Sequence, residues 1–395
     1  MKQLIPCIAV LAAALAGAAC GDNLAAEDPC RDPEPGVACR WAGLSAGQEG
    51  FNGDGLHRLD TEIYWSMDML WASDGTAWFL DWNNHLVRRV LADDTVETVV
   101  GWTDPIFPGD GVPGQAAAER IEDGAPGTDV RLNHPTDFAE LPDGSILVMA
   151  WHNHKLRRVD PETGLVTIMC GSGAGFVGDG GPASGALFKQ PKSLVVDEDG
   201  AIYIGDQQNF RVRKIDVDGT ISTVVGNGVQ AFAGDGGPAT EASLNWEAGD
   251  NPEPSGGLAV ADGTLYVSDT LNHRIRAVDL ASGTIETIAG TGAQGNTGDG
   301  GPAVEATLNG PRDIEIGPDG QLYVADTDNS VIRAIDLHSG VIRRVAGRDE
   351  PGLDSEDALP AIETALHRPF GVELDHLGNL YIMDTLNSRI LKVAR

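Results

Sequence analysis

The sequence predicts an all-β protein built from six similar four-stranded antiparallel units, and three observations carry this prediction. Glycine is abundant, with 51 of 395 residues, whereas aromatic residues make up only 6%, which is typical of many short strands joined by tight turns. One polar pattern recurs six times at intervals of roughly 60 residues, a period that indicates a repeat fold. An Asp-Gly pair, a strong hairpin signal, precedes five of the six copies.

The recurring pattern is clearest between Gly263 and Arg276. Its Asp269 corresponds to five other positions, Asp81, Ala150, Asp206, Asp326 and Asp384. Three residues later every copy has an asparagine, namely Asn84, Asn153, Asn209, Asn272, Asn329 and Asn387. Four residues further on, five copies have an arginine and the last has a leucine, namely Arg88, Arg157, Arg213, Arg276, Arg333 and Leu391.

Each copy is expected to supply four strands in chain order. In the fourth copy, an apolar segment ends at the Asp262-Gly263 turn, and the next strands are expected at 265–267, 274–278 and 284–289. These segments are rich in the β-branched and aromatic residues that favour sheets. Six such units, each covered on both faces by its neighbours, predict a six-bladed β-propeller of four-stranded antiparallel blades.

The two ends of the chain are expected to complete one blade together. The sixth copy stops after its third strand, whereas residues 37–42 form an apolar segment that has no sequence neighbour to pair with. We expect residues 37–42 to pair with residues 388–394 as the fourth strand of the sixth blade. Such closure removes an exposed sheet edge, which would otherwise invite aggregation.

The repeated residues also support a resemblance to a known family. The pattern Gly-x-Leu-Tyr-Val-x-Asp-x-x-Asn-His-Arg-Ile-Arg, with the loop Gly-Asp-Gly-Gly-Pro-Ala, resembles NHL-repeat six-bladed propellers, especially bacterial secreted proteins of this type and the NHL portion of teneurins. The resemblance covers residues 37–395 and implies a propeller. It implies little about function, because related propellers include adhesion and signalling modules, RNA binders, and lyase or lactonase enzymes.

The net charge excludes two classes of partner. With 27 Lys and Arg against 59 Asp and Glu, the formal net charge is −32. Nucleic-acid binding depends on basic side chains that release counterions from phosphates, so a nucleic-acid partner is not expected. A basic patch for docking on an anionic membrane surface is not expected either.

The N-terminal residues predict export. Lys2 is followed by a short apolar core and small residues up to Ala19, so residues 1–19 are interpreted as a signal peptide. Cys20 directly follows and resembles the lipidated cysteine of bacterial lipoproteins, although Gly17 stands where Leu or Val is usual; cleavage without lipidation is the alternative. Residues 20–36 are acidic and Pro-rich and predict a tether to the propeller at 37–395.

Export would place the cysteines in an oxidising compartment and the protein in the cell envelope or outside the cell. Cys30 and Cys39 could pair in an oxidising compartment, whereas Cys170 lies in an apolar context that predicts a buried thiol. The expected location is the bacterial cell envelope, as an outer-membrane or periplasmic lipoprotein, with a membrane contact only through a lipid on Cys20; otherwise the chain is secreted. A monomer is expected.

The repeated polar residues are interpreted as architecture. A catalytic centre needs one constellation, whereas the Asp-x-x-Asn-x-x-x-Arg set recurs along the whole chain, with Ala150 replacing the Asp in one copy and Leu391 the Arg in another. An Asp facing an Arg on the adjacent strand would satisfy buried charges. The Gly-Asp-Gly loops, such as that at Asp235, should make one face acidic and attract cations or basic partners. Calcium is one interpretation of these loops, and turn geometry is the favoured one.

Breaks in the repeat are better candidates for function. Asp68, Asp137 and Asp313 lie six residues before the Asp-Gly turn, where the other copies have Ser193, Gly256 and Gly371. Three carboxylates converging on the channel could hold a divalent cation, calcium or zinc. His134 and His367 lie at the starts of inner strands and are further candidate metal ligands. No sequence motif indicates a cofactor.

Long loops supply candidate partner-binding aromatic residues. Residues 102–134 form a loop that contains Trp102 and Phe107, and a second long loop begins at Trp246. Aromatic residues on such loops favour recognition of a partner. A loop that packs on itself and covers the channel is the alternative.

Two functional hypotheses follow. The first is a non-enzymatic binding module that recognises an unknown protein or glycan through its acidic, loop-rich face. The second is a metal-assisted hydrolase or lyase, similar to lactonases or amidating lyases, at the central channel mouth. Binding is favoured because no single catalytic constellation stands out, and enzymatic activity is left undecided.

Overall fold

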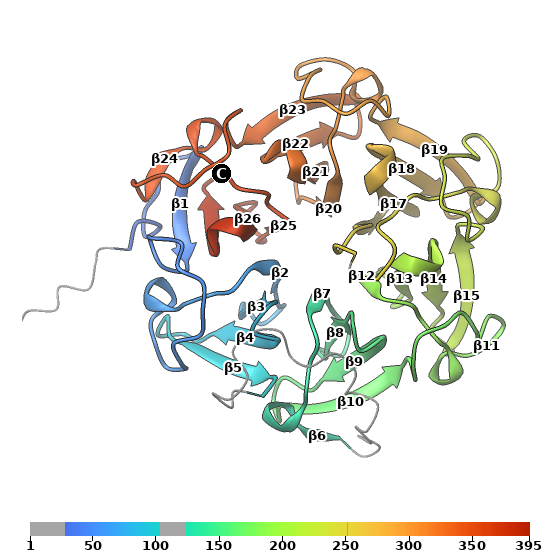
Figure 1. The fold of residues 1–395 in the computed structure, drawn as a ribbon, viewed down its shortest axis with the longest axis horizontal. Coiled ribbons are helices and arrows are strands. Elements are labelled where there is room, and N and C mark those ends of the chain that lie inside the picture. Colours follow the sequence, from blue (N-terminus) through green and yellow to red (C-terminus); the bar gives the residue numbers. More distant parts are fainter. Residues whose placement is uncertain (1–27, 103–123, 251) are drawn as a thin grey trace, which may run out of the picture.

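The computed structural model describes residues 28–102, 124–250 and 252–395. In these ranges the chain forms six antiparallel sheets arranged around a central axis, and no α-helix (Figure 1). The predicted six-bladed propeller is confirmed. No helix within the described ranges has the length and apolarity to cross a membrane.

Each blade runs from an inner strand at the axis to an outer strand at the rim. Blade 1 contains β2 (Ser66–Trp71), β3 (Ala77–Asp81), β4 (Leu86–Val90) and β5 (Val96–Val100). Blade 2 contains β7 (Pro135–Glu140), β8 (Ile146–Ala150), β9 (Lys155–Val159) and β10 (Leu165–Cys170). Blade 3 contains β12 (Pro191–Val196), β13 (Ile202–Asp206), β14 (Arg211–Ile215) and β15 (Thr220–Val225).

The second half of the ring repeats this order. Blade 4 contains β16 (Leu258–Ala261), β17 (Thr264–Asp269), β18 (Arg274–Asp279) and β19 (Thr284–Ala289). Blade 5 contains β20 (Pro311–Ile316), β21 (Gln321–Asp326), β22 (Val331–Asp336) and β23 (Val341–Ala346). Blade 6 contains β25 (Gly371–Leu374), β26 (Leu380–Asp384), β27 (Arg389–Val393) and, from the N-terminal side, β1 (Val37–Ala42).

Strand β1 closes the ring as predicted. It pairs with β27 in antiparallel register, with Ala38 opposite Val393 and Arg40 opposite Leu391. In Figure 1 the blue β1 lies beside the red strands of the C-terminal end. Three short strands add a fifth member to blades 2, 3 and 6, namely β6 (Ala125–Pro126), β11 (Gly181–Pro182) and β24 (Ala358–Pro360).

Single-turn 3-10 helices occupy two recurring places. One set lies in or near the loops that lead to the next blade: η1 (Arg58–Asp60), η3 (Gly127–Asp129), η4 (Ala183–Gly185), η6 (Ala239–Glu241), η8 (Ala303–Glu305) and η10 (Ala361–Glu363). The other set forms the turn between the second and third strands: η5 (Gln207–Asn209), η7 (Thr270–Asn272), η9 (Thr327–Asn329) and η11 (Thr385–Asn387).

The hydrophobic core is divided into clusters between neighbouring blades. Trp78 and Leu80 of blade 1, for example, pack with Val148 of blade 2. Because both faces of a blade are covered, its strands are apolar on both sides rather than alternating. Burial between blades accounts for most of the apolar sequence, so functional side chains must be sought at the ends of strands and along the axis.

Candidate functional site

The repeated aspartate and arginine form buried ion pairs inside the blades. Asp269 Oδ2 lies 3.2 Å from Arg276 Nη1, and both side chains are fully buried. The pair recurs as Asp81–Arg88, Asp206–Arg213, Asp326–Arg333 and Asp384–Arg389. Burial raises the pKa of Asp269 to about 6, against the lowering effect of hydrogen bonds from Asn272 and Asn245 and of the Arg276 charge. These residues stabilise blades, as the sequence predicted.

The sixth blade corrects the sequence alignment. Sequence spacing placed Leu391 at the arginine position, but Arg389 pairs with Asp384, its Nε 2.8 Å from Oδ2. Arg389 is the residue directly opposite Asp384 in the β26–β27 register. Blade 6 therefore keeps the ion pair, with an arginine two residues earlier on the third strand. A fixed sequence spacing could not reveal this.

The aspartates of the Gly-Asp-Gly loops contact the same arginines. Asp235 Oδ1 lies 2.6 Å from Arg276 Nη2, and Thr287 Oγ1 donates to Asp235 Oδ2 at 2.7 Å. Equivalent loop pairs are Asp54–Arg88, Asp179–Arg213 and Asp299–Arg333. The loop that leads to blade 6 lacks the Gly-Asp-Gly sequence, and its Asp354 pairs with Arg348 instead of the repeat arginine. These carboxylates are therefore partly neutralised, so the loop face is less acidic than a count of its aspartates suggests.

The histidines that follow the repeat asparagine connect successive blades. His273 has a left-handed backbone (φ 53°), and its Nδ1 accepts a hydrogen bond from the Gly310 amide at 3.1 Å. His154 Nδ1 accepts from the Gln190 amide in the same way, at 2.9 Å. An imidazole that accepts through Nδ1 carries its proton on Nε2 and is neutral. These histidines are architectural.

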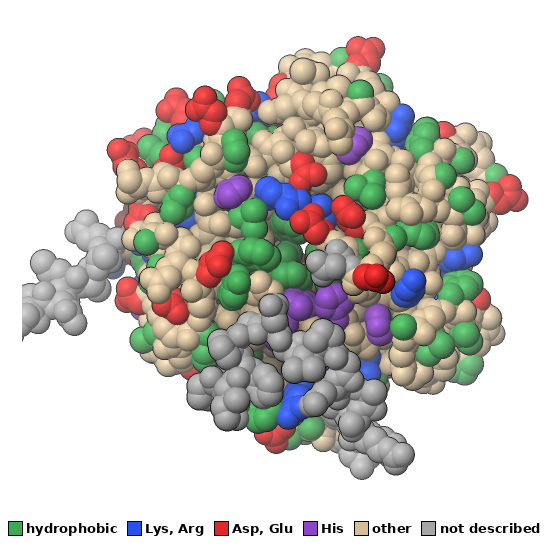
Figure 2. All heavy atoms as spheres, in the orientation of Figure 1, with side chains coloured by type: hydrophobic (Ala, Val, Ile, Leu, Met, Phe, Trp, Pro, Cys, Tyr) green, Lys and Arg blue, Asp and Glu red, His purple; other side chains and the backbone are tan. Residues whose placement is uncertain are grey.

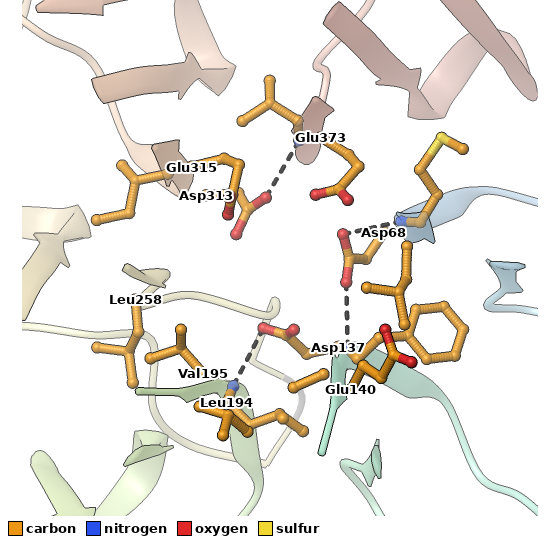
Figure 3. Close-up of a pocket in the computed structure, with 16 residues that line it drawn as sticks. Asp68, Asp137, Glu140, Leu194, Val195, Leu258, Asp313, Glu315 and Glu373 are labelled. Atoms are coloured by element: carbon orange, nitrogen blue, oxygen red, sulfur yellow. Dashed lines mark hydrogen bonds between the residues drawn. The ribbon is translucent and has the colours of Figure 1, made fainter. Parts of the chain in front are cut away.

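The three aspartates of the inner strands do point into the central channel, but each one holds a neighbouring blade (Figure 3). Asp68 Oδ2 accepts from the Phe138 amide at 3.2 Å. Asp137 and Asp313 likewise accept through Oδ2 from the inner-strand amides of Leu194 (3.2 Å) and Val372 (3.1 Å).

A buried lysine completes this arrangement. Lys192 Nζ lies 3.1 Å from Asp313 Oδ1 and 3.7 Å from Asp137 Oδ2. No three His, Cys, Asp or Glu side chains of the described residues are placed to hold a metal ion. The expected calcium or zinc ligand set of Asp68, Asp137 and Asp313 is therefore not assembled, because backbone amides and an ammonium group already engage these carboxylates.

In blade 4, the residue equivalent to the channel aspartates is one position later than the sequence comparison gave. Gly257, rather than Gly256, occupies the aspartate position in blade 4, because Leu258 pairs with Val267 as Ile314 pairs with Val324. The hairpin between the first two strands of blade 4 is one residue shorter than that of blade 5. Counting six residues back from the Asp-Gly turn therefore gave Gly256 instead of Gly257.

The channel below these aspartates holds two further carboxylates. Glu315 and Glu373 line a cavity of about 190 Å³ together with the three aspartates. Burial, followed by repulsion from Asp313 and Asp137, raises the pKa of Glu315 to about 8. Burial likewise raises the pKa of Asp137 to about 7, although Lys192 opposes this, and it raises the pKa of Glu373 strongly. Carboxyl groups of the channel, Glu315 and Glu373 above all, therefore stay protonated near neutral pH.

The side chains around the channel mouth differ from blade to blade. In each blade, one backbone amide ahead of the inner strand donates to the repeat aspartate, or to Asn153 in blade 2. We call the residue that directly follows this amide a mouth position. In blades 1 to 6 the mouth positions are Trp65, His134, Gln190, Trp246, Gly310 and Arg368. All except Trp246 have a left-handed backbone, with φ between 47° and 62°. Such a conformation is unfavourable for residues other than glycine and often occurs at functional sites.

Blades 1 and 2 present an aromatic and imidazole wall. The rings of Trp65 and Trp82 are stacked, with centroids 5.9 Å apart and planes at 19°. The ring of Trp82 also contacts the ring of His134, with centroids 4.2 Å apart. The ring of Trp151 stacks on that of His152, with centroids 4.0 Å apart. We call these five residues the aromatic wall.

The tautomers of the two wall histidines follow from their contacts. His134 Nε2 lies 3.2 Å from Asn83 Oδ1, an acceptor, so this nitrogen carries the proton. His134 Nδ1 then accepts from His152 Nδ1 at 2.9 Å, and His152 Nε2 is left as an acceptor. Burial lowers the pKa of His134 to about 2 and that of His152 to about 4, so both are neutral at physiological pH.

The opposite side of the mouth carries charge. Arg368 donates to Glu253 through two parallel bonds, Nη1 to Oε1 at 3.0 Å and Nη2 to Oε2 at 2.8 Å. Arg312 also donates to Glu253, and Arg368 reaches Asp328 at 2.8 Å. Figure 2 shows a hollow at the centre of this face, with histidines on one side and a group of basic and acidic side chains on the other.

Comparisons with known proteins agree with the repeat. A family model described as the teneurin NHL domain matches residues 172–232 and 279–360. SUPPRESSOR OF QUENCHING 1 of Arabidopsis thaliana is 27% identical over 307 residues, which cover 75% of this chain and 27% of that protein. Human NHL repeat-containing protein 2 is 28% identical over 291 residues, or 66% of this chain and 38% of that protein.

Human teneurin-1 is 29% identical over 242 residues, which cover 55% of this chain and 8% of that protein. The family match, these relatives and the six observed blades agree. The chain is an NHL-repeat six-bladed propeller. It spans well under half the length of each of these three relatives.

Solved structures share the fold of this NHL propeller. An auxiliary nutrient binding protein from Bacteroides thetaiotaomicron superposes with a TM-score of 0.63 at 15% identity, covering 90% of this chain and 75% of that one. A gluconolactonase from Xanthomonas campestris superposes with a TM-score of 0.50 at 15% identity, covering 84% and 86%. At these identities the likeness concerns the fold alone.

The predicted partner-binding aromatics of the NHL propeller have different outcomes. Trp246 is fully buried, because the insertion that follows it in blade 4 covers the ring, and its Nε1 donates to the Ser268 carbonyl at 2.8 Å. The expectation that Trp246 is an exposed contact residue is wrong. Trp102 is 42% exposed and lies under the Arg131 guanidinium, 4.3 Å from the ring centroid. Phe107 lies outside the described residues.

The remaining candidates are also placed. His134 belongs to the aromatic wall, whereas His367 lies at the mouth in blade 6, where its amide donates to Asp384 Oδ1 at 2.7 Å. Cys30 and Cys39 form a disulfide. Cys170 is buried, and burial raises the pKa of its thiol to about 12. Cys20 lies outside the described residues.

Sequence reasoning missed the residues that surround the channel most closely. Lys192, Glu315, Trp82 and Arg368 were not singled out. A signal existed for the last two, because each breaks the repeat: Trp82 stands where three blades have threonine, and Arg368 where blade 5 has Gly310. Aligning the six copies position by position would have marked them.

Proposed function

We propose that this NHL-repeat propeller is an exported, non-enzymatic binding module that holds a saccharide at the mouth of its central channel. The observation that carries the proposal is that the repeated polar side chains stabilise the blades, whereas the side chains that differ from blade to blade lie at the mouth. The repeated Asp, Asn and Arg residues are engaged in ion pairs and turns within the blades. The non-repeated residues gather at the mouth, as the aromatic wall and the charged group around Glu253.

The chemistry of the aromatic wall favours a saccharide over a peptide. A pyranose ring has an apolar C–H face and a polar edge. The partly buried indole rings of Trp65 and Trp82, flanked by hydrogen-bonding groups, complement both, whereas Trp151 is fully buried. A peptide that adds a strand needs an open sheet edge, whereas the inner strands face the axis and β1 closes the ring. A propeller of the same fold is described as an auxiliary nutrient binding protein, which is compatible with this class of ligand.

Donor groups at the mouth also lack acceptors. Among the described residues, the buried Nε1 atoms of Trp82 and Trp151 and the buried Nε of Arg312 have no hydrogen-bond partner. Unsatisfied buried donors are costly and rare. Because these atoms are shielded from solvent, a buried water beside the ligand, or a shift of the side chains that cover them, is needed to bring an oxygen acceptor to them.

Titration with defined oligosaccharides tests the proposal. The purified protein is titrated with cellohexaose, maltohexaose, xylohexaose and hexagalacturonate while tryptophan fluorescence is recorded. We expect saturable quenching by at least one of them. Trp65→Ala and Trp82→Ala should weaken that binding by about tenfold, because aromatic stacking contributes about 1 kcal/mol or more at such sites.

The matched control is Phe232→Ala, which removes a half-exposed aromatic ring from an outer loop. It should leave the affinity unchanged. Absence of binding by all four oligosaccharides would overturn the proposal, as would binding that survives both tryptophan substitutions.

Export and anchoring belong to the same proposal. The Cys30–Cys39 disulfide suits an oxidising compartment outside the cytoplasm. The mature chain would then be held in the bacterial cell envelope by a lipid on Cys20, act as a monomer and have no nucleic-acid partner. Cell fractionation of the wild type and of Cys20→Ala tests this, because loss of the lipid should release the protein from the membrane fraction. An unchanged distribution would contradict lipidation.

A further inference from the structure

We infer that the saccharide is acidic, and that its carboxylate binds Arg368 and Arg312 in the place that the side chain of Glu253 occupies. This inference rests on the proposed function and specifies its ligand class, a hexuronate-containing oligosaccharide. Four observations about the mouth carry it.

The two arginines form a built carboxylate site. Arg368 binds Glu253 through the bidentate geometry that matches guanidinium to carboxylate. Arg312 adds a second guanidinium, and its side chain is only 2% exposed. Both cations lie near the ring of Phe370, at 5.3 Å and 4.8 Å from its centroid. The ring and the burial hold the two guanidinium groups in position without the ligand.

Glu253 is an exchangeable occupant of this site. Its side chain is 45% exposed, in contrast to the arginine beneath it. The backbone on either side is anchored independently, because Gln207 Nε2 donates to the carbonyls of Glu247 and Glu253 at 3.0 and 2.9 Å. A rotation of the Glu253 side chain alone would therefore free the edges of the two guanidinium groups that it engages and leave the insertion in place. Asp328 would stay on Arg368 Nε and Nη2, and Glu247 would stay 3.7 Å from Arg312 Nη2.

The carboxylate site and the aromatic wall lie on consecutive blades. Arg368 is the mouth position of blade 6, and Trp65 is the mouth position of blade 1. These blades meet closely: Thr385 Oγ1 donates to the Ser66 carbonyl at 2.9 Å, and a side chain at Gly371 would collide with the Met67 carbonyl. The Arg368 guanidinium points toward Glu253 and Asp328, across the hollow from the histidines of the wall (Figure 2). An oligosaccharide that spans the hollow can thus rest one ring on the wall and present the carboxylate of another ring to Arg368.

The hydrogen-bond donors and acceptors of the site favour the same ligand class. Nε of Arg312 is buried and has no acceptor among the residues that the structure describes. His152 Nε2 and Asp328, in contrast, offer acceptors for hydroxyl groups. A neutral sugar would leave the guanidinium pair to Glu253, whereas a hexuronate supplies the anion as well as the hydroxyl donors.

Isothermal titration with trigalacturonate and cellotriose tests the inference. We expect the wild type to bind trigalacturonate more tightly than cellotriose. Arg368→Gln should weaken trigalacturonate binding by about tenfold or more, because a charge-assisted bidentate contact is lost. Glu253→Gln should strengthen it by about fivefold, because the competing anion is removed, and should leave cellotriose binding unchanged.

The control variant is Arg343→Gln, an exposed arginine on the outer strand β23, which should have no effect. Equal binding of both trisaccharides, unaffected by Arg368→Gln, would overturn this inference and leave the saccharide-binding function standing. No binding of either trisaccharide would overturn this inference, and the saccharide-binding function would fall with it only if none of the four hexaoses bound either. Sodium acetate that competes as well as trigalacturonate at equal carboxylate concentration would show an anion site without sugar recognition, and would also overturn the inference.

Discussion

The repeated aspartate and arginine illustrate how single residues are used in this propeller. Asp269 and Arg276 are both fully buried and hydrogen-bonded to each other and to nearby loops. An isolated buried charge is far more costly than a paired one. Their recurrence in five blades therefore reflects a stabilising role inside each blade.

Replacing Arg276 by Met should strongly destabilise the protein. The Asp269 carboxylate would stay buried without its partner, so the free energy of unfolding should fall by about 3–5 kcal/mol, measured by urea unfolding at pH 8. The loss should shrink at pH 5, because the pKa of Asp269, already raised to about 6, would rise further and the protonated acid needs no cation.

Two comparisons control this prediction. Arg343→Met removes an exposed arginine and should change stability by less than about 0.5 kcal/mol. Asp269→Asn combined with Arg276→Met should recover part of the loss. An equal effect of the Arg276 and Arg343 variants would contradict the structural role of the pair.

Among the elements, β1 has a special role because it joins the two ends of the chain. Its Cys39, Trp41 and Ala42 are buried in one cluster with Met383 and Ile390 of blade 6. The Cys30–Cys39 disulfide ties the preceding segment to this strand. Without β1, the edge of β27 would be exposed and able to pair with another chain.

A variant that lacks residues 1–42 should therefore melt at a lower temperature and aggregate. We expect Tm to fall by about 5–10 °C, since each kcal/mol shifts Tm by about 2–4 °C in domains of this order of size, as measured by circular dichroism. A synthetic peptide of residues 28–42 should restore much of the lost Tm. A variant that lacks only residues 1–27 should retain the wild-type Tm; if it melts as low as the longer truncation, β1 does not close the ring.

At the scale of the whole molecule, ring closure brings carboxylates from several blades onto one axis. Asp68, Asp137, Asp313, Glu315 and Glu373 share the channel with Lys192. A carboxyl group whose pKa is higher in the folded state than in the unfolded state stabilises the fold when protonated, and this contribution is lost as the pH rises through the folded pKa.

Replacing Glu315 by Gln tests this linkage. The pKa of Glu315 is raised from 4.5 to about 8, so its stabilising contribution is complete below pH 4.5 and is lost by about pH 8. The variant has no such titration. Its stability relative to the wild type should therefore increase between pH 5 and pH 9, by about 2–4 kcal/mol, in urea unfolding measured at both pH values. Glu198→Gln, at an exposed turn, should show no such difference, and a pH-independent effect of Glu315→Gln would contradict the raised pKa.

Strand order, blade number and closure were predictable because their signals are local. The Asp-Gly turns, the apolar strands and the spacing of Asp269, Asn272 and Arg276 are properties of short segments. Residues 37–42 could be assigned to blade 6 because a regular repeat shows which strand is lacking. The architectural role of the repeated polar residues followed from their recurrence alone.

The composition of the channel and of its mouth came only from the tertiary structure. Lys192 and Asp313 are 121 residues apart and meet at the axis because the ring closes. Trp246 was misjudged because an insertion folds over it, and the three channel aspartates because the amides of adjacent blades engage them. Strand patterns depend on neighbouring residues, whereas burial and charge pairing at the axis depend on which blades meet there, and no short segment encodes that convergence.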